Sequence, residues 1–187
     1  MKKLIFISFT VIFFTVASLA PVYAGWNPFK KEKAEDQKMK NRKVAEAIAN
    51  FKNKDPNMKV FFEKAYGYAV FPTVAKGGFG IGGAYGKGEV FKKGKLIGYS
   101  SLTQLTIGFQ LGGQAYSEII FFKDKKTLDD FKDGNFEFGA QASAVAVTAG
   151  VSADADYNNG VAIFTIVKGG LMYEASVGGQ KFSYDPK

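Results

Sequence analysis

The sequence contains no cysteine and no histidine. Without cysteine, the chain forms no disulfide and offers no thiolate to a metal, to a nucleophilic mechanism or to a lipid anchor. Without histidine, it lacks the commonest general base and the commonest ligand of transition metals. Most catalytic and metal-centred functions are therefore disfavoured, and we predict a non-enzymatic protein with no cofactor.

Glycine and aromatic residues are abundant instead, with 22 Gly, 19 Phe and 9 Tyr among 187 residues. Aromatic side chains at this level favour β-structure over a helical bundle. Apolar residues make up 47% of the chain, which is enough for one domain with a hydrophobic core. The formal net charge of +8 suggests an anionic partner.

Residues 1–24 have the pattern of a secretory signal peptide. Two lysines follow Met1, an apolar run extends from Leu4 to Ala20, and Val22 and Ala24 occupy the positions that precede a cleavage point. We expect cleavage after Ala24 and a periplasmic or secreted protein, the alternative being an uncleaved membrane anchor. Export separates the chain from cytoplasmic nucleic acid, so nucleic acid is not an expected partner.

Residues 25–54 are predicted to form a basic arm. Apolar residues recur in its second half at helical spacing, whereas residues 30–43 are polar all round. Aromatic rings beside lysines suit the interface of an anionic membrane, where amines meet phosphates. The alternative is a short N-terminus whose aromatics pack on the domain and whose lysines only solvate it. The candidate lipid-binding residues are Trp26, Phe29, Lys30, Lys31, Lys33, Lys38, Lys40, Arg42, Lys43, Val44, Ile48 and Phe51.

A domain is predicted over residues 55–187. Asp55 and Pro56 indicate the start of a short amphipathic helix that ends at Gly67. The apolar period then changes to two, which predicts strands, with one helix at 124–133. The strands are expected at 68–71, 89–93, 95–100, 105–111, 118–122, 136–151, 161–167 and 171–177, with a last one ending at Tyr184. The predicted fold is α+β: N-terminal amphipathic helices packed on a curled or barrel-like antiparallel sheet, rich in Gly, with one inserted short helix.

Seven of the twelve residues from Gly77 to Gly88 are glycine. A dinucleotide-binding or phosphate-binding loop needs a helix after the glycines, but strand-like residues follow here. Glycine within strands marks bulges, bends or close approach of two backbones. We therefore predict that this segment lies under one of the leading helices, at a tight corner of the sheet.

Acidic residues suggest two further sites. Asp154, Asp156 and Asn158 resemble part of a calcium loop, but the glycine is displaced by one position and Thr165 stands where a bidentate glutamate is needed. We expect a polar hairpin turn there and no metal, the alternative being weak calcium binding outside the cytoplasm. The acids considered for hydrolysis by paired carboxylates are Glu118, Glu137 and Glu174, each expected as an ordinary outward acid of a strand.

Two motifs resemble the SYLF domain family. They are Ala65-Tyr-Gly-Tyr-Ala-Val-Phe-Pro72 and the glycine segment, with its pattern Gly82-Gly-Ala-Tyr-Gly-Lys-Gly88. Shorter blocks at 108–112, 168–171 and 176–178 are also similar, so the resemblance covers about residues 40–184. The residues regarded as the signature of the fold are Gly67, Pro72, Gly77, Gly78, Gly82, Gly83, Gly86 and Gly88.

The resemblance implies a lipid-binding domain. Eukaryotic members of the family bind phosphoinositide-rich membranes with the help of an amphipathic N-terminal helix, and some bind actin. This chain has no attached SH3 or FYVE module, and its predicted export makes actin an unexpected partner. We therefore expect an anionic phospholipid with a phosphoinositide-type headgroup chemistry. The alternative is an envelope structural or protein-interaction module that uses the glycine-rich sheet surface, for example to self-associate.

Overall fold

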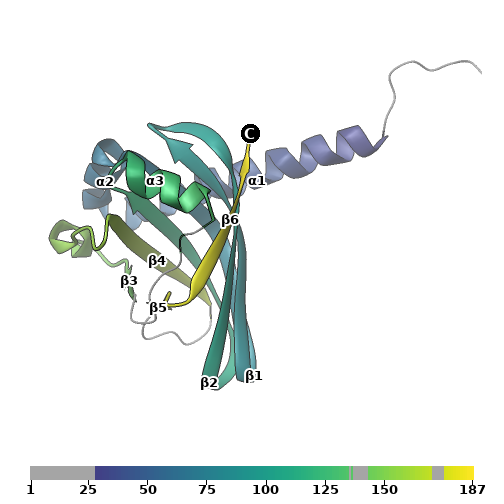
Figure 1. Ribbon diagram of the computed structural model, residues 1–187, viewed down its shortest axis with the longest axis vertical. Coiled ribbons are helices and arrows are strands. Elements are labelled where there is room, and N and C mark those ends of the chain that lie inside the picture. Colours follow the sequence, from purple (N-terminus) through teal and green to yellow (C-terminus); the bar gives the residue numbers. More distant parts are fainter. Residues whose placement is uncertain (1–27, 135, 137–142, 170–174) are drawn as a thin grey trace, which may run out of the picture.

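The computed structural model describes residues 28–134, 136, 143–169 and 175–187. The sheet order is β1-β2-β4-β3-β5, and β6 pairs with a separate part of β2. Every strand pair is antiparallel except β3 with β4. The predicted α+β fold with a curled antiparallel sheet is confirmed (Figure 1). In chain order the elements are α1 (Pro28–Lys54), η1 (Pro56–Met58), α2 (Lys59–Lys64), β1 (Gly67–Lys92), β2 (Lys95–Phe122), α3 (Lys125–Lys132), β3 (Ser143–Ala146), η2 (Val151–Asp154), β4 (Val161–Gly169), β5 (Ala175–Ser176) and β6 (Gln180–Pro186).

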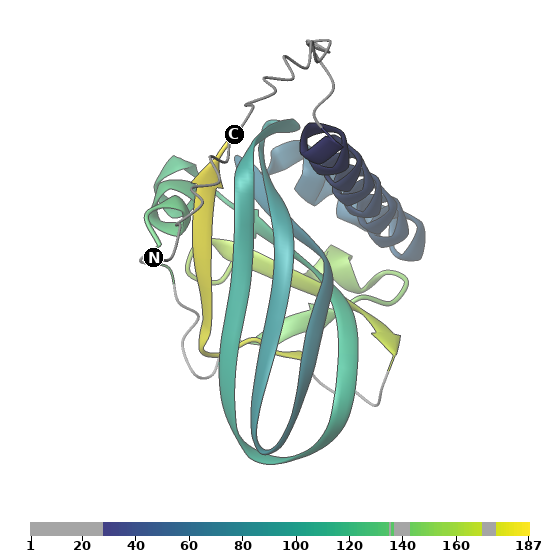
Figure 2. The ribbon, with the colours of Figure 1, turned by 90° about the vertical axis from the view of Figure 1, so that its right-hand side faces the viewer.

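Strands β1 and β2 form one long hairpin that doubles back on itself. Lys93 and Gly94 close it with φ angles of 47° and 74°, the backbone of a two-residue hairpin turn. The register shifts between Phe79 and Ile81, and Figure 2 shows both strands turning back at the bottom of the view. The strands predicted at 89–93 and 95–100 are confirmed as the two sides of this turn. The strands predicted at 105–111 and 118–122 are parts of the single strand β2.

Glycines allow the two halves of β1, before and after the bend, to come into contact. A Cβ atom on Gly88 would lie 2.6 Å from the carbonyl oxygen of Val70, and one on Gly67 would lie 2.7 Å from that of Phe91. In each of these two close approaches, the two residues lie at equal sequence distances on either side of residue 79, next to the register shift. The prediction of a tight corner with close backbone approach is therefore confirmed. Glycines 77 and 78 pair with Gly113 and Gly112 beside the bend, and Pro72 lies in a bulge between residues 71 and 74.

The bend divides the sheet into two layers that pack on each other. The first layer holds the start of β1, the end of β2, β4 and β3, and the second holds the end of β1, the start of β2, and β6. Successive residues along the strands of the first layer point to opposite faces, so they belong to two different hydrophobic clusters. Phe71 and Ile120 pack between the layers with Phe182, whereas Val70 and Ile119 pack against the helices. The molecule is thus a stack of helices, first layer and second layer.

Helix α1 is part of this stack. Val44 and Ala47 are 3% exposed and Phe51 is fully buried, in the same cluster as Phe61 of α2 and Phe164 of β4. The expectation that each leading helix has an apolar face to bury is confirmed. The polar residues 35–43 continue the same helix instead of forming a separate disordered segment.

Asp55 ties the start of η1 to η2. Its Oδ1 accepts a hydrogen bond from Asn57 N at 3.0 Å, and its Oδ2 accepts from Ser152 N at 2.8 Å and from Ser152 Oγ at 2.6 Å. Burial alone would raise the pKa of Asp55, but these hydrogen bonds hold it below its usual value. The predicted N-cap is confirmed, although the helix begins as a 3₁₀ turn.

Replacing Asp55 by alanine should lower the free energy of unfolding by about 3 kcal/mol, because buried donors lose a charged acceptor. The folded-state pKa lies below the unfolded one, so this contribution is present above the ordinary Asp range and is lost as pH falls through the lowered pKa. Urea titrations at neutral and acidic pH measure both effects. Asp156→Ala, which removes an exposed acid nearby, is the control and should cost little.

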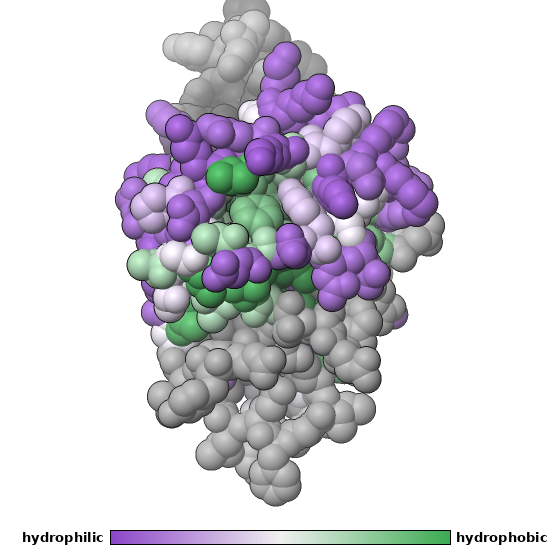
Figure 3. Space-filling model, turned by 90° about the vertical axis from the view of Figure 1, so that its left-hand side faces the viewer, coloured by the Kyte–Doolittle hydropathy of each residue, from purple (hydrophilic) through white to green (hydrophobic). Residues whose placement is uncertain are grey.

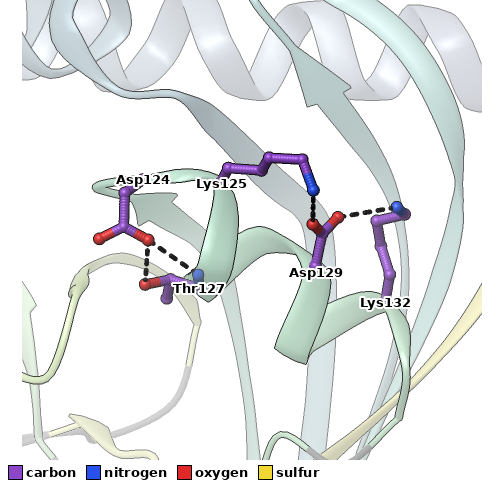
Figure 4. Close-up of polar contacts among 5 residues, drawn as sticks. All are labelled: Asp124, Lys125, Thr127, Asp129 and Lys132. Atoms are coloured by element: carbon purple, nitrogen blue, oxygen red, sulfur yellow. Dashed lines mark hydrogen bonds and ion pairs between the residues drawn. The ribbon is translucent and has the colours of Figure 1, made fainter.

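The inserted helix is confirmed as α3. Asp124 Oδ1 accepts from Thr127 N at 2.9 Å and from Thr127 Oγ1 at 3.0 Å, and Asp129 joins Lys125 to Lys132 (Figure 4). The strand predicted at 136–151 is confirmed at 143–146, which form β3, and is wrong at its end, where Gly150 turns the chain into η2 with a φ of 85°. Residues 137–142 and 170–174 lie outside the described part.

Candidate functional site

A groove of about 470 Å³ lies between α1 and strands β1, β2 and β6. The prediction that the glycine segment lies under a leading helix is met only at the end of the segment, where Tyr85, Lys87 and Gly88 line the groove together with α1. The lining residues come from four elements. They are Gln37, Lys40, Lys43 and Val44 of α1; Pro72, Thr73, Tyr85, Lys87, Gly88 and Glu89 of β1; Tyr99, Ser100 and Ser101 of β2; and Asp185 of β6.

The floor of the groove consists of rows of side chains across β1, β2 and β6. Glu89 is paired with Tyr99, which is paired with Asp185. One row further along, Lys87 is paired with Ser101, which is paired in turn with Ser183. The Ser101 and Ser183 hydroxyls lie 2.6 Å apart. These rows alternate with interior residues such as Val90 and Leu102, so they face away from the core.

Helix α1 forms the wall of the groove. With the Asn41 amide oriented so that its nitrogen faces the sheet, it donates to Glu89 Oε1 at 2.7 Å. Lys40 and Lys43, one position before and two after Asn41, are both exposed and line the groove. Lys40 also lies 3.6 Å from Asp36, a solvent-exposed pair that contributes little to stability.

Glu89 is the buried acid of this site, with 4% of its surface exposed. Burial raises the pKa of its carboxyl, and the positive charge of Lys187 acts in the opposite direction. One wall and the floor therefore carry three lysines, which are partly offset by Glu89 and Asp185. With the hydroxyls of Thr73 and Tyr99 beside them, the lysines suit an oxyanion with further hydrogen-bonding groups.

The predicted lipid-binding residues fall into four groups. Lys40, Lys43 and Val44 line the groove, whereas Lys38 and Arg42 are exposed on α1 outside it. Ile48 is half-buried and Phe51 fully buried. The hypothesis that the apolar stripe inserts into lipid therefore needs correction, because the core of this structure already uses it. Trp26 and the side chains of Phe29, Lys30, Lys31 and Lys33 lie outside the described part.

Sequence reasoning missed the sheet half of the groove. Period-two alternation puts Lys87 and Glu89 on one face of β1, a signal that was available. Nothing in the sequence indicates that Asp185, almost a hundred residues later, lies two strands from Glu89.

The acidic candidates have structural roles. Asn158 and Val161 exchange backbone hydrogen bonds around Asn159 and Gly160, which have φ angles of 49° and 82°. The polar hairpin turn is thus confirmed, and in the described chain no cluster of three acids is placed to hold a metal. Glu118 is fully buried, contrary to the expected outward position, and Glu137 and Glu174 lie outside the described residues.

A second hollow lies on the described surface, away from the groove. A pocket of about 370 Å³ lies between α2 and η2, with Val60, Phe61, Lys64 and Tyr157 in its lining. Figure 3, seen from the side where α2 and α3 lie in Figure 1, shows apolar surface framed by hydrophilic residues. Of the helices described, none combines the length and apolar character required to cross a bilayer.

Comparisons with known proteins give two matches. Residues 103–187 match the family model Ysc84, described as "Las17-binding protein actin regulator". The chain is also similar to Beta cell expansion factor A of Aeromonas veronii, with 31% identity over 144 residues. That alignment covers 74% of this chain and 53% of the relative, so the chain spans about half the length of the curated relative it matches.

Proposed function

Because the chain belongs to the Ysc84, or SYLF, family, we propose that it is a non-enzymatic protein that associates with membranes by binding anionic phospholipid. The observation that carries the proposal is the groove between α1 and the sheet, where Lys40, Lys43 and Lys87 converge. We propose that the protein acts in the bacterial envelope or outside the cell, because the sequence of residues 1–24 predicts a signal peptide. Actin regulation belongs to the description of the family model and is not part of the proposal.

Electrostatic attraction would supply most of the binding. Each lysine held near an anionic surface contributes about 1 kcal/mol, and the effect decreases beyond a Debye length of about 10 Å. Lys40 and Lys43 are exposed on the helix, and Lys87 is exposed on the sheet, so a headgroup in the groove would contact cations from two sides. The buried stripe of α1 holds this wall in place by packing in the core.

Vesicle co-sedimentation tests the proposal. The purified protein should bind vesicles that contain phosphatidylglycerol and leave pure phosphatidylcholine vesicles unbound, and binding should weaken as salt is added. Equal binding to both vesicles, or no binding at low salt, would contradict lipid recognition by charge. An absence of lipid binding together with self-association in light scattering would favour the interaction-module alternative. Deletion of α1 is unsuitable as a test, because it removes Val44 and Phe51 from the core.

A further inference from the structure

The groove contains carboxylates as well as lysines, and a bare phosphate site does not need them. Glu89 and Asp185 belong to the same cross-strand row, on either side of Tyr99. Each would repel a phosphate group placed beside it. Glu89 is also nine-tenths buried and opposite Asn41, so it is built into the site and is not an incidental surface acid.

The acids and cations are separated along the strands in a regular way. Lys87 lies two residues from Glu89 on β1, a spacing of about 7 Å. Lys43 stands above the floor on α1, and all three residues line the groove. Neighbouring residues in one row have Cβ atoms about 5 Å apart, so the acid row presents acceptors over roughly 10 Å. A ligand with its phosphate at the lysines thus has carboxylate oxygens within reach of its other end.

We propose that this groove selects a polyol phosphate headgroup, such as the glycerol phosphate of phosphatidylglycerol. This inference rests on the proposed function. The lysines hold the phosphate, and hydroxyl groups at the far end donate hydrogen bonds to Glu89 and Asp185. A hydroxyl is neutral, so Lys87 and Lys43 do not repel it. An ammonium group also pairs with carboxylates, so the test includes a headgroup that carries one.

The test compares vesicles of equal anionic mole fraction that contain phosphatidylglycerol, phosphatidic acid or phosphatidylserine in phosphatidylcholine. We expect about tenfold tighter binding to phosphatidylglycerol than to phosphatidic acid, because the headgroup hydroxyls add one or two hydrogen bonds to charged carboxylates. In Asp185→Ala the preference should disappear, while binding to phosphatidic acid increases because a negative charge has been removed. Asp156→Ala, an exposed acid outside the groove, should raise binding to every anionic vesicle slightly and keep the preference.

Soluble competitors distinguish a lipid headgroup from a free metabolite. Glycerol phosphate should displace the protein from phosphatidylglycerol vesicles at a lower concentration than inorganic phosphate does. Saturation by glycerol phosphate with no affinity for vesicles would retain the polyol chemistry and overturn the lipid source. Equal binding to phosphatidylglycerol and phosphatidic acid, a preference for phosphatidylserine, or an unchanged preference in Asp185→Ala would overturn the inference. Lipid binding that still depends on charge would leave the proposed function intact.

Discussion

Alanine at position 88 should destabilise the protein by about 3 kcal/mol or prevent it from folding. A Cβ atom there would lie 2.6 Å from Val70 O and 2.7 Å from the Phe71 ring, and a carbonyl oxygen in a strand has little freedom to move. The two layers meet at this point, so relief of the clash requires the bent hairpin to open. Chemical denaturation followed by circular dichroism measures the loss.

Gly169→Ala is the matched control. Gly169 is also a strand glycine, it has no positive φ, and a Cβ atom there would have no heavy atom within 4 Å. Its replacement should leave stability unchanged or raise it by about 0.5 kcal/mol, because alanine restricts the unfolded chain. If Gly88→Ala proves as stable as Gly169→Ala, the two halves of β1 do not pack as closely as described here.

Stability should fall as pH rises from about 4.5 to about 8, because Glu118 is fully buried. Gln180 Nε2 donates to Glu118 Oε2 at 3.0 Å, while Glu118 Oε1 and Thr165 Oγ1 have no partner among the described residues. Burial raises the pKa of Glu118 to about 8. The unfolded chain releases this proton at lower pH than the folded chain, so ionisation favours unfolding across that window, by up to about 1 kcal/mol per pH unit.

Glu118→Gln should remove this dependence on pH, because a neutral amide replaces the acid. The midpoints of urea denaturation, measured at intervals from acidic to mildly alkaline pH, give the slope for each protein. Glu63→Gln on α2 changes an exposed acid and should keep the wild-type slope. Equal slopes in wild type and Glu118→Gln would show that Glu118 ionises as freely in the folded protein as in the unfolded one.

The sequence predicts the helices well because their signals are local. The spacing of Val44, Ala47 and Phe51 determines the buried face of α1, and Asp124 together with Thr127 starts α3. The turn at Lys93-Gly94 is equally local, since glycine permits the left-handed backbone. These elements need no knowledge of distant residues.

The glycine segment predicts a corner, but which backbones meet there, and the groove beside it, depend on contacts that a single sequence does not display. No turn motif occurs at residue 79, and the corner forms because glycines at 67 and 88 let distant backbones approach. Likewise, Glu89 and Asp185 share a cross-strand row, on either side of Tyr99, only through the registers of β1 and β6 on β2. The anionic ligand suggested by the net charge stays a prediction. The apolar contacts that the sequence pattern assigned to Phe51 are wrong, because the core requires this side chain.

The most direct test of the account is the vesicle affinity of a protein with the three groove lysines neutralised, Lys40→Gln, Lys43→Gln and Lys87→Gln together. All three side chains are exposed, so folding should be retained. The control neutralises three exposed lysines outside the groove, Lys59, Lys125 and Lys126, with the same change in net charge. The account predicts that the groove variant loses about 100-fold in affinity for phosphatidylglycerol vesicles, as expected for three cations at about 1 kcal/mol each, while the control loses much less. Equal losses in the two variants would contradict it, because binding would then follow net charge and not the groove.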